Sequence, residues 1–498
     1  TAAYPQGADA DEHEGRTLLD AGPLTPTAWH DDRMAGLGAR ATRRGVVAAA
    51  LATTVVGCSD ETVGGHPLPV ERSGSGSSKG KPNLLVIITD DQRWDHFSAS
   101  PSAPKYLHTP AIDALTNAGV RCDNAFVTTA LCSPSRATFL TGTYASRHGV
   151  RNNLTAWDPA LTTVFEPLMS SGYDCAFIGK WHMPGGVPDL RGVDRFVTFT
   201  AQGGQGQYFD CPLLIDGMMT PRPGKYITED LTTQALSWLD ERDEQTPWCL
   251  YLAHKAVHHQ FEPPAHLLGT MDDVDLSDMP PEAYAFMTTL DRNVWEGTVA
   301  GLERNYRRYL ETVLGLDEQI GRLLDSIDLT NTYVVFTSDN GYSWGEHVVS
   351  GKRWAYEENT RVPFLVAGPG ISPGSHDHLV TNADLAPTLL EWAGAAPLPE
   401  AQGRSLAPLL AGRTQSLRDD FMYEYFLDFP YNVPAMQAVR TDDWLWIEFD
   451  SDLAPELYDV HKDPHTRTNL SVSEPEVATT LAARLSALRA DVAAGAVV

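Results

Sequence analysis

The strongest constraint on the fold is a run of apolar, mostly branched residues at positions 84–88, Leu-Leu-Val-Ile-Ile. A strand made only of apolar residues, without polar ones in alternation, is buried on both faces, as in a parallel sheet that helices cover. Similar runs recur at residues 176–178, 248–252, 333–336 and 363–366. These runs predict the strands of one central sheet.

Helical patterns separate these runs, at residues 109–118, 229–240 and 302–326. The last of them carries apolar residues at every third or fourth position, as a helix does when one face lies in a core. Alternating strands and helices predict an α/β fold with a mixed, mostly parallel central sheet between layers of helices. In such folds the active site lies beyond the carboxyl ends of the strands.

The pattern changes near the C-terminus. Residues 421–426 and 444–449 are rich in aromatic side chains that partly alternate with polar ones, which predicts antiparallel strands. A closing helix with leucines on one face follows. We therefore expect a catalytic domain over residues 82–396 and a smaller C-terminal subdomain with an antiparallel sheet over residues 397–498.

Charge and cysteine content exclude several classes of protein. The 498 residues carry 65 acidic and 37 basic side chains, for a net charge of −28, which repels nucleic-acid phosphates and argues against a DNA or RNA partner. The six cysteines show no CxxC spacing, so neither a disulfide scaffold nor a zinc ribbon is predicted.

Residues 1–58 have the pattern of a targeting segment. Arg43 and Arg44 precede small and apolar residues at 46–56, a run shorter than the roughly 20 residues that span a bilayer. Such a run is typical of a cleaved export signal, and the paired arginines resemble a twin-arginine signal. Gly57-Cys58 resembles the end of a bacterial lipoprotein signal. We expect export, with lipid on Cys58 as the only contact with the membrane; a small-residue helix packed in a core is the alternative.

The flanks of this segment support the same interpretation. The first methionine is Met34, so we expect translation to begin there and residues 1–33 to lie upstream of the true start. Residues 59–81 end in a Gly/Ser-rich stretch, which predicts a flexible tether between the anchor and the folded domain.

Carboxylates follow two of the predicted strands. Asp90-Asp91 come directly after the first run, and Asp339-Asn340 come just after the run at 333–336. Adjacent carboxylates repel one another and need a cation, and an all-oxygen ligand set suits Ca²⁺ or Mg²⁺ better than zinc. The alternative for each pair alone is a helix cap or a turn. Together they predict a metal site.

Basic residues and histidines follow two further strands. Lys180 and His182 come after the run at 176–178, and His254 and His258 come after the run at 248–252. Cations beside a metal-binding set predict an anionic ligand with several oxygens. His254 and His258 have the spacing of a zinc-binding pair on a helix, but nearby prolines disfavour a helix there. Lys352 adds a further cation.

Residues 132–136, Cys-Ser-Pro-Ser-Arg, open a predicted helix. A helix N-terminus stabilises anions, so Cys132 is a candidate thiolate nucleophile with His258 as its base. The same segment resembles the signature of the formylglycine-dependent type I sulfatases of the alkaline phosphatase superfamily. Other motifs resembling that family occur in its order across residues 82–396: Asp90-Asp91, Gly179-Lys180-Trp181-His182, Val257-His258, Ser338-Asp339-Asn340-Gly341 and Gly345-Glu346-His347 with Lys352.

The resemblance implies a cofactor set and a reaction. A separate formylglycine-generating enzyme would oxidise Cys132 to formylglycine (3-oxoalanine). One Ca²⁺ per chain would be held by the following residues: Asp90, Asp91, modified Cys132, Asp339 and Asn340. The hydrated aldehyde would attack the sulfur of a sulfate ester on a small molecule or a glycan, and Asp339 would assist its deprotonation.

The resemblance also implies roles for the surrounding cations and histidines. Lys352 or His258 would protonate the leaving alcohol, and His182 would activate the second hydroxyl that releases sulfate. Arg136 and Lys180 would stabilise the formylglycine diol and the charge near it.

Two alternatives have other substrates or none. A phosphonate or phosphate monoester hydrolase of the same superfamily also uses this signature, but it typically has Asp-His where this chain has Asp339-Asn340. A non-catalytic glycan-binding lipoprotein would not need the complete set of lysines and histidines. The motifs do not distinguish aryl, choline, steroid and polysaccharide sulfates.

Overall fold

The structure is a computed structural model that describes residues 80–185, 190–277, 279 and 299–498. The predicted targeting segment lies outside these residues, as does nearly all of the predicted tether. Among the described helices, none is both long and apolar enough to cross a membrane.

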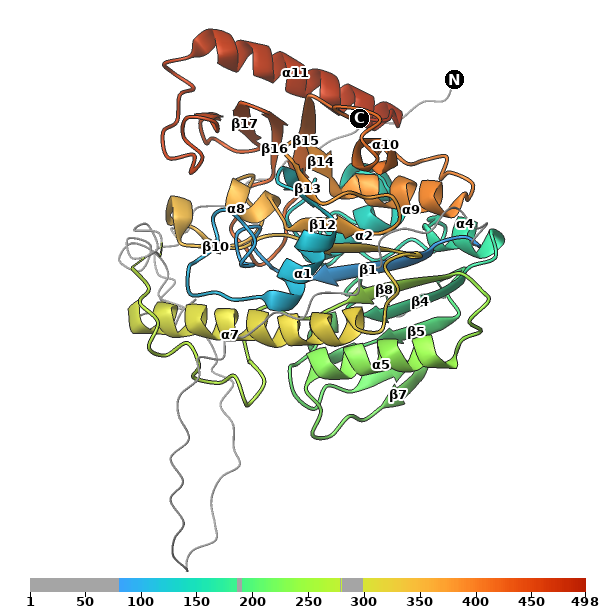
Figure 1. Cartoon of the computed structure of the whole chain (residues 1–498). Coiled ribbons are helices and arrows are strands. Elements are labelled where there is room, and N and C mark those ends of the chain that lie inside the picture. The colour runs from blue at the N-terminus through green and yellow to red at the C-terminus, as the bar shows by residue number, and fades with distance from the viewer. Residues whose placement is uncertain (1–79, 186–189, 278, 280–298) are drawn as a thin grey trace, which may run out of the picture. The chain divides into compact units, whose positions relative to one another are not determined.

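A ten-stranded mixed sheet forms the centre of the described fold (Figure 1). Its strands lie in the order β13 (Gly374–His376), β2 (Val120–Cys122), β12 (Phe364–Ala367), β9 (Thr332–Ser338), β1 (Asn83–Thr89), β8 (Trp248–Ala253), β4 (Asp174–Gly179), β5 (Arg195–Thr198), β6 (Leu213–Ile215) and β7 (Met218–Thr220). The contiguous strands β9, β1, β8, β4 and β5 run parallel. The predicted α/β fold with a mixed, mostly parallel sheet is confirmed.

Strand β1 is buried on both faces, as its unbroken apolar run predicts. Leu85 and Ile87 belong to one hydrophobic cluster, and Leu84, Val86 and Ile88 belong to another on the opposite face. All five side chains are fully buried. The two clusters separate because successive side chains of a strand point to opposite faces.

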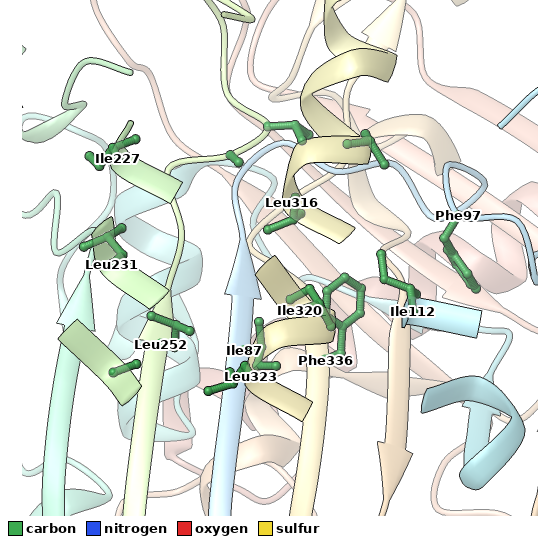
Figure 2. Packing of buried hydrophobic residues seen from close by; sticks show 14 of the residues in the cluster. Ile87, Phe97, Ile112, Ile227, Leu231, Leu252, Leu316, Ile320, Leu323 and Phe336 are labelled. Atoms are coloured by element: carbon green, nitrogen blue, oxygen red, sulfur yellow. The ribbon is translucent and has the colours of Figure 1, made fainter. Parts of the chain in front are cut away.

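Helices cover both faces of the sheet. Helices α1 (Pro110–Ala118), α5 (Ile227–Glu241) and α7 (Val299–Leu324) pack on the face of Leu85 and Ile87 (Figure 1). Figure 2 shows Leu316, Ile320 and Leu323 of α7 packed against this face, as their spacing predicts. Helices α2 (Cys132–Thr141), α4 (Phe165–Ser170) and α9 (Leu385–Ala393) pack on the other face.

The C-terminal part forms a separate four-stranded antiparallel sheet, also as predicted. It consists of β15 (Asp420–Tyr425), β16 (Met436–Thr441), β17 (Trp444–Phe449) and β18 (Glu456–Asp459). One face packs against the closing helix α11 (Pro475–Ala494), and the other packs against residues around Leu131. The second contact brings this sheet close to the beginning of α2.

One predicted strand runs in a direction that its sequence does not reveal. The run at 363–366 forms β12, which is antiparallel to β9. An apolar run indicates that a strand is buried but not which way it runs, because parallel and antiparallel neighbouring strands bury it equally. The remaining elements are short: β3 (Ala125–Phe126), α3 (Ala145–His148), β10 (Ser343–Trp344), β11 (Ser350–Gly351), α8 (Glu357–Thr360), β14 (Val380–Thr381), α10 (Ala407–Leu410) and the 3-10 turns Ala201–Gly204, Glu346–Val348 and Asn382–Asp384.

Candidate active site

The carboxyl ends of β1 and β9 bring the predicted carboxylates together. The strands are parallel and in register up to Thr89 and Ser338, so the residues that follow them adjoin. Asp339 Oδ1 accepts a hydrogen bond from the backbone N of Asp91 at 3.2 Å, and Asn340 Nδ2 donates to Asp91 Oδ1 at 2.7 Å. Asp90 is fully buried beside them.

Cys132 lies at the first position of α2 and is surrounded by charged groups. Its Sγ lies 3.5 Å from Asp90 Oδ1, 2.8 Å from Lys352 Nζ and 3.6 Å from Lys180 Nζ. Lys352 also donates to Asp91, and Lys180 also donates to Asp90. The predicted nucleophile, two predicted metal ligands and two predicted cations thus form one connected cluster.

The position of Lys180 depends on the glycine before it. Gly179 ends β4 with φ +119°, and a Cβ added to it would lie 1.8 Å from the carbonyl oxygen of Ala253 on β8. Only glycine permits this backbone conformation and this close approach. The close pairing of β4 with β8 therefore sets where Lys180 enters the cluster.

Arg136 lies one helical turn after Cys132, so both side chains leave the same side of α2. Its Nε donates to Asp339 Oδ2 at 2.9 Å, and its Nη1 donates to the carbonyl oxygen of Lys180 at 3.1 Å. Arg136 thereby joins helix α2 to the ends of β9 and β4.

The histidines differ in how they meet the cluster. His258 Nε2 lies 3.7 Å from Asp91 Oδ2, and Tyr208 holds the His258 carbonyl through a 2.7 Å hydrogen bond. The carbonyl of His182 accepts a bond from Ser133 Oγ at 2.8 Å, while its buried Nδ1 has no hydrogen-bond partner among the described residues.

The charges of the cluster are balanced within the described residues. Three buried carboxylates (Asp90, Asp91 and Asp339) face three buried cations (Arg136, Lys180 and Lys352). Burial alone would raise the pKa of Asp90, but Lys180 and the other positive groups hold it well below its ordinary value. Burial raises the pKa of Asp339 to about 6, with Arg136 opposing the shift.

Burial also sets the protonation of the other reactive groups. It raises the pKa of the Cys132 thiol to about 12, although Lys180 and Lys352 oppose this. Burial and the charge of Lys180 hold the pKa values of His182 and His258 well below the ordinary value. Lys352 has its pKa raised, because Asp91 and other negative groups outweigh burial. At neutral pH the thiol and both rings are neutral, and Lys352 is charged.

The cluster has the features of a metal site. One ligand atom each from Asp90, Asp91, Cys132 and His258 lies within 4.8 Å of the others. The Oδ1 atom of Asn340 is buried and has no hydrogen-bond partner among the described residues. An unpaired buried amide oxygen beside paired carboxylates fits a hard divalent cation.

His254 does not join this cluster. It is fully buried, and neither of its ring nitrogens has a hydrogen-bond partner within the described chain. The segment that carries it is not helical. The zinc pair considered from the spacing of His254 and His258 is therefore absent from this described region.

The structure adds residues that the motifs did not indicate. Gln205 Oε1 accepts from Lys180 Nζ at 2.8 Å, and Asn153 Oδ1 accepts from the backbone N of Ser133 at 3.0 Å. Asp428, from the C-terminal subdomain, pairs with Arg353 at 2.7 Å. Isolated polar residues in loops carry no pattern in a single sequence, so only the fold reveals them.

A hollow in the protein surface lies apart from this cluster. Its volume is about 940 Å³, and its described lining includes Arg93, Glu346, Arg361 and Arg440 but none of the predicted catalytic residues. Two charge pairs line it, Arg93–Glu346 and Arg440–Glu357. We therefore take the cluster around Cys132, and not this hollow, as the candidate active site.

Fold and site together define a hydrolase of the alkaline phosphatase superfamily, with a candidate nucleophile at a helix start between lysines and carboxylates. The family model described as Sulfatase matches residues 82–395, and the model described as N-sulphoglucosamine sulphohydrolase, C-terminal, matches residues 345–491. The chain belongs to the sulfatase family and is a sulfatase.

Curated relatives cover most of the chain. An N-acetylglucosamine-6-O-sulfatase of Bacteroides thetaiotaomicron is 29% identical over 78% of this chain and 82% of its own length. A choline-sulfatase of Rhizobium meliloti is also 29% identical, over 79% of this chain and 83% of its own length.

Solved structures agree in fold. A protein in complex with its substrate D-glucosamine-2-N,6-O-disulfate superposes with a TM-score of 0.77 and 26% identity, covering 83% of this chain and 98% of that one. A phosphonate monoester hydrolase of Agrobacterium radiobacter superposes with a TM-score of 0.67, covering 83% of this chain and 97% of that one; at 22% identity it shares the fold alone.

Proposed function

We propose that this sulfatase hydrolyses sulfate esters of amino-sugar glycans, with Cys132 converted to formylglycine and Ca²⁺ bound beside it. The observation that carries the proposal is the position of Cys132 Sγ, in contact with Lys180, Lys352 and Asp90 at once. This arrangement surrounds the reacting atom with the cations that an anionic transition state requires.

The thiol itself is poorly suited to attack. Its raised pKa keeps Cys132 protonated at neutral pH, and a neutral thiol is a weak nucleophile. This favours the formylglycine mechanism over a plain thiolate with His258 as base. Formylglycine, once hydrated, supplies a hydroxyl nucleophile at this position. The separate generating enzyme would be a transient partner.

The metal would be held by Asp90, Asp91, Asp339 and Asn340 together with modified Cys132, and His258 lies close enough to be a further ligand. Bound Ca²⁺ would supply positive charge against the sulfate oxygens. It would also leave the cluster with excess positive charge, since the carboxylates and cations otherwise balance.

The protonation states of Lys352, His258 and His182 suit different roles in proton transfer. Lys352 is charged and contacts Cys132 Sγ, so it is placed to protonate the leaving alcohol. His258 is neutral, which makes it the weaker candidate for that role. His182 is neutral and has a free buried Nδ1, which suits a base that releases sulfate from the enzyme. Arg136 orients Asp339 throughout.

The proposed substrate class is based on the similar proteins. The relatives and the solved complex named above act on sulfated glucosamine or choline sulfate. Both the N-acetylglucosamine-6-O-sulfatase and the solved complex concern sulfated glucosamine, whereas one relative named above is a choline-sulfatase. A glycan sulfate fits better. Asp339-Asn340 disfavours the phosphonate and phosphate monoester alternative, and the intact cluster disfavours a non-catalytic lipoprotein.

The test is sulfate release by protein co-expressed with a formylglycine-generating enzyme. We expect turnover of glucosamine 6-sulfate, with choline sulfate and an aryl monoester of a phosphonic acid hydrolysed much more slowly. Activity should fall on chelation and return with Ca²⁺ but not with zinc. Preferential hydrolysis of the phosphonate, or activity that requires stoichiometric zinc, would contradict the proposal.

The location is also part of the proposal. The order of paired arginines, apolar run, Cys58 and Gly/Ser-rich tether supports export as a lipoprotein held outside the cytoplasmic membrane. A twin-arginine route carries folded proteins, so Cys132 would be modified before export. The acidic chain gains nothing from anionic lipid, so the anchor would supply the attachment.

A further inference from the structure

A loop of the C-terminal sheet is fixed to both sides of the catalytic cluster. It joins β15 to β16 and spans residues 426–435. Asp428 within it is buried, accepts from Arg353 at 2.7 Å and accepts from the backbone N of Asn153 at 3.3 Å. Arg353 adjoins Lys352, and Asn153 binds the backbone N of Ser133, the neighbour of Cys132. Asp428 therefore closes a ring of contacts that begins and ends at Cys132.

The residues on either side of Asp428 point away from the protein. Leu427, Phe429 and Tyr431 are 65%, 80% and 54% exposed, whereas Asp428 is 2% exposed. Large apolar side chains concentrated on one rigidly anchored loop mark a binding surface more often than scattered ones do. The anchor thus holds this exposed loop against Arg353, the residue that follows Lys352.

Tyr431 has a defined place within this surface. The Arg353 guanidinium covers one face of its ring, 3.4 Å from the ring centre. Arg353 has a φ of +98°, a conformation that costs free energy for a residue with a side chain, and Asp428 and Tyr423 hold it there. The Tyr431 ring therefore contacts the residue that follows Lys352, and Lys352 is the group that we propose protonates the leaving alcohol.

Local positive charge accompanies the rings. Arg151 is exposed and lies over the ring of Phe426, 5.1 Å from its centre. The chain as a whole carries a net charge of −28, which repels a sulfated glycan. Arg151 offsets this repulsion locally at the loop, whereas the charge of Arg353 is balanced by Asp428.

We propose that residues 426–431 form the subsite for the sugar ring that carries the sulfate ester, with Phe429 and Tyr431 packing against the apolar C–H face of the pyranose. The inference rests on the proposed glycan sulfatase function. The C-terminal subdomain would then bind the sugar, which is the leaving group of the reaction. An aromatic ring with hydrogen-bonding and cationic neighbours matches a sulfated sugar, which has an apolar face and anionic edges.

The test compares a double variant, Phe429→Ala with Tyr431→Ala, with the wild type. We expect KM for glucosamine 6-sulfate to rise about tenfold, because the lost contact is made equally in the ground and transition states, while kcat stays within about twofold. Inorganic sulfate carries no sugar, so its inhibition constant should not change. Leu453→Ala, which removes an equally exposed apolar side chain from the same subdomain, is the matched control.

The outcomes separate the two proposals. An unchanged KM in a wild type that hydrolyses glucosamine 6-sulfate would overturn the subsite and leave the function standing. A rise in both KM and the sulfate inhibition constant would show that the loop supports the catalytic cluster rather than the sugar. A wild type that hydrolyses sulfate esters but no sugar sulfate would refute the substrate class, and the subsite with it.

Discussion

Cys132, Lys180 and Lys352 come from three distant segments, yet the sequence motifs already indicate each of them as a candidate site residue. They could be predicted because each belongs to a motif of several adjacent residues just beyond a strand or at a helix start. Asp428 and Gln205 could not be predicted, because each acts alone from a loop and its importance depends on packing. The protonation states also needed the structure, since burial dominates the pKa shifts of Cys132 and His182.

Lys352 gives a prediction that depends on the leaving group. Lys352→Ala removes the charged group nearest Cys132, so we expect kcat for glucosamine 6-sulfate to fall by about 10²–10⁴-fold. The loss should be smaller for 4-nitrophenyl sulfate, whose leaving group departs without a proton. Steady-state kinetics on both esters measure this, with the exposed Lys225→Ala as control. Equal losses on both esters would exclude the role of proton donor.

At the scale of elements, strands and helices followed from local patterns, but their directions and partners did not. Apolar runs and helical spacing predicted β1, β8 and α7 closely. The short strands β6 and β7 at one end of the sheet and the antiparallel course of β12 depend on strand pairing, which a single sequence does not display.

The contact between β4 and β8 can be tested through its glycine. Gly179→Ala would place a Cβ 1.8 Å from the carbonyl oxygen of Ala253 and would strain a φ of +119°. We expect the strands to separate locally, at a cost of about 1–3 kcal/mol, with loss of activity as Lys180 moves. Thermal unfolding and kinetics measure both effects. Gly374→Ala, which meets no atom within 4 Å, should change neither, and a Gly179→Ala enzyme of normal stability would contradict the account.

The junction between β15 and α3 predicts a pH dependence. Burial raises the pKa of Glu424 from 4.5 to about 7, although Ser146 donates to it. Between these values the unfolded chain releases the proton and the folded chain keeps it. The free energy of unfolding should therefore decrease as pH rises through this window, by about 3 kcal/mol from this residue.

Glu424→Gln removes this titration, so its stability should depend less on pH over the same window. Urea unfolding at several pH values measures the difference, with the exposed Glu476→Gln as control. If wild type and Glu424→Gln lost stability in parallel, Glu424 would not be the titrating group.

At the scale of the whole molecule, the catalytic cluster is assembled by the central sheet, and the C-terminal sheet packs beside the beginning of α2. The fold class, the family and the metal-compatible cluster could all be anticipated from the order of motifs. The domain boundaries at residues 81 and 396 stay predictions, and so does the targeting segment, which lies outside the described residues.

Location is tested by fractionating cells that express the wild type or Cys58→Ala. We expect the wild type in the membrane fraction, exposed outside the cytoplasmic membrane, because a lipidated cysteine carries enough acyl chains for stable anchoring. Cys58→Ala should leave that fraction and keep its sulfatase activity. If both proteins were found in the soluble fraction to the same extent, the lipid anchor would be refuted. The proposed catalytic roles would be unaffected.

The most direct test of the account is the chemical identity of residue 132 in active enzyme. Mass spectrometry of the proteolytic peptide spanning residues 122–136 should show an aldehyde in place of the Cys132 thiol, in a proportion that tracks specific activity. Cys132→Ala should keep the fold and lose turnover. Full activity in protein whose Cys132 remains an unmodified thiol would contradict the mechanism.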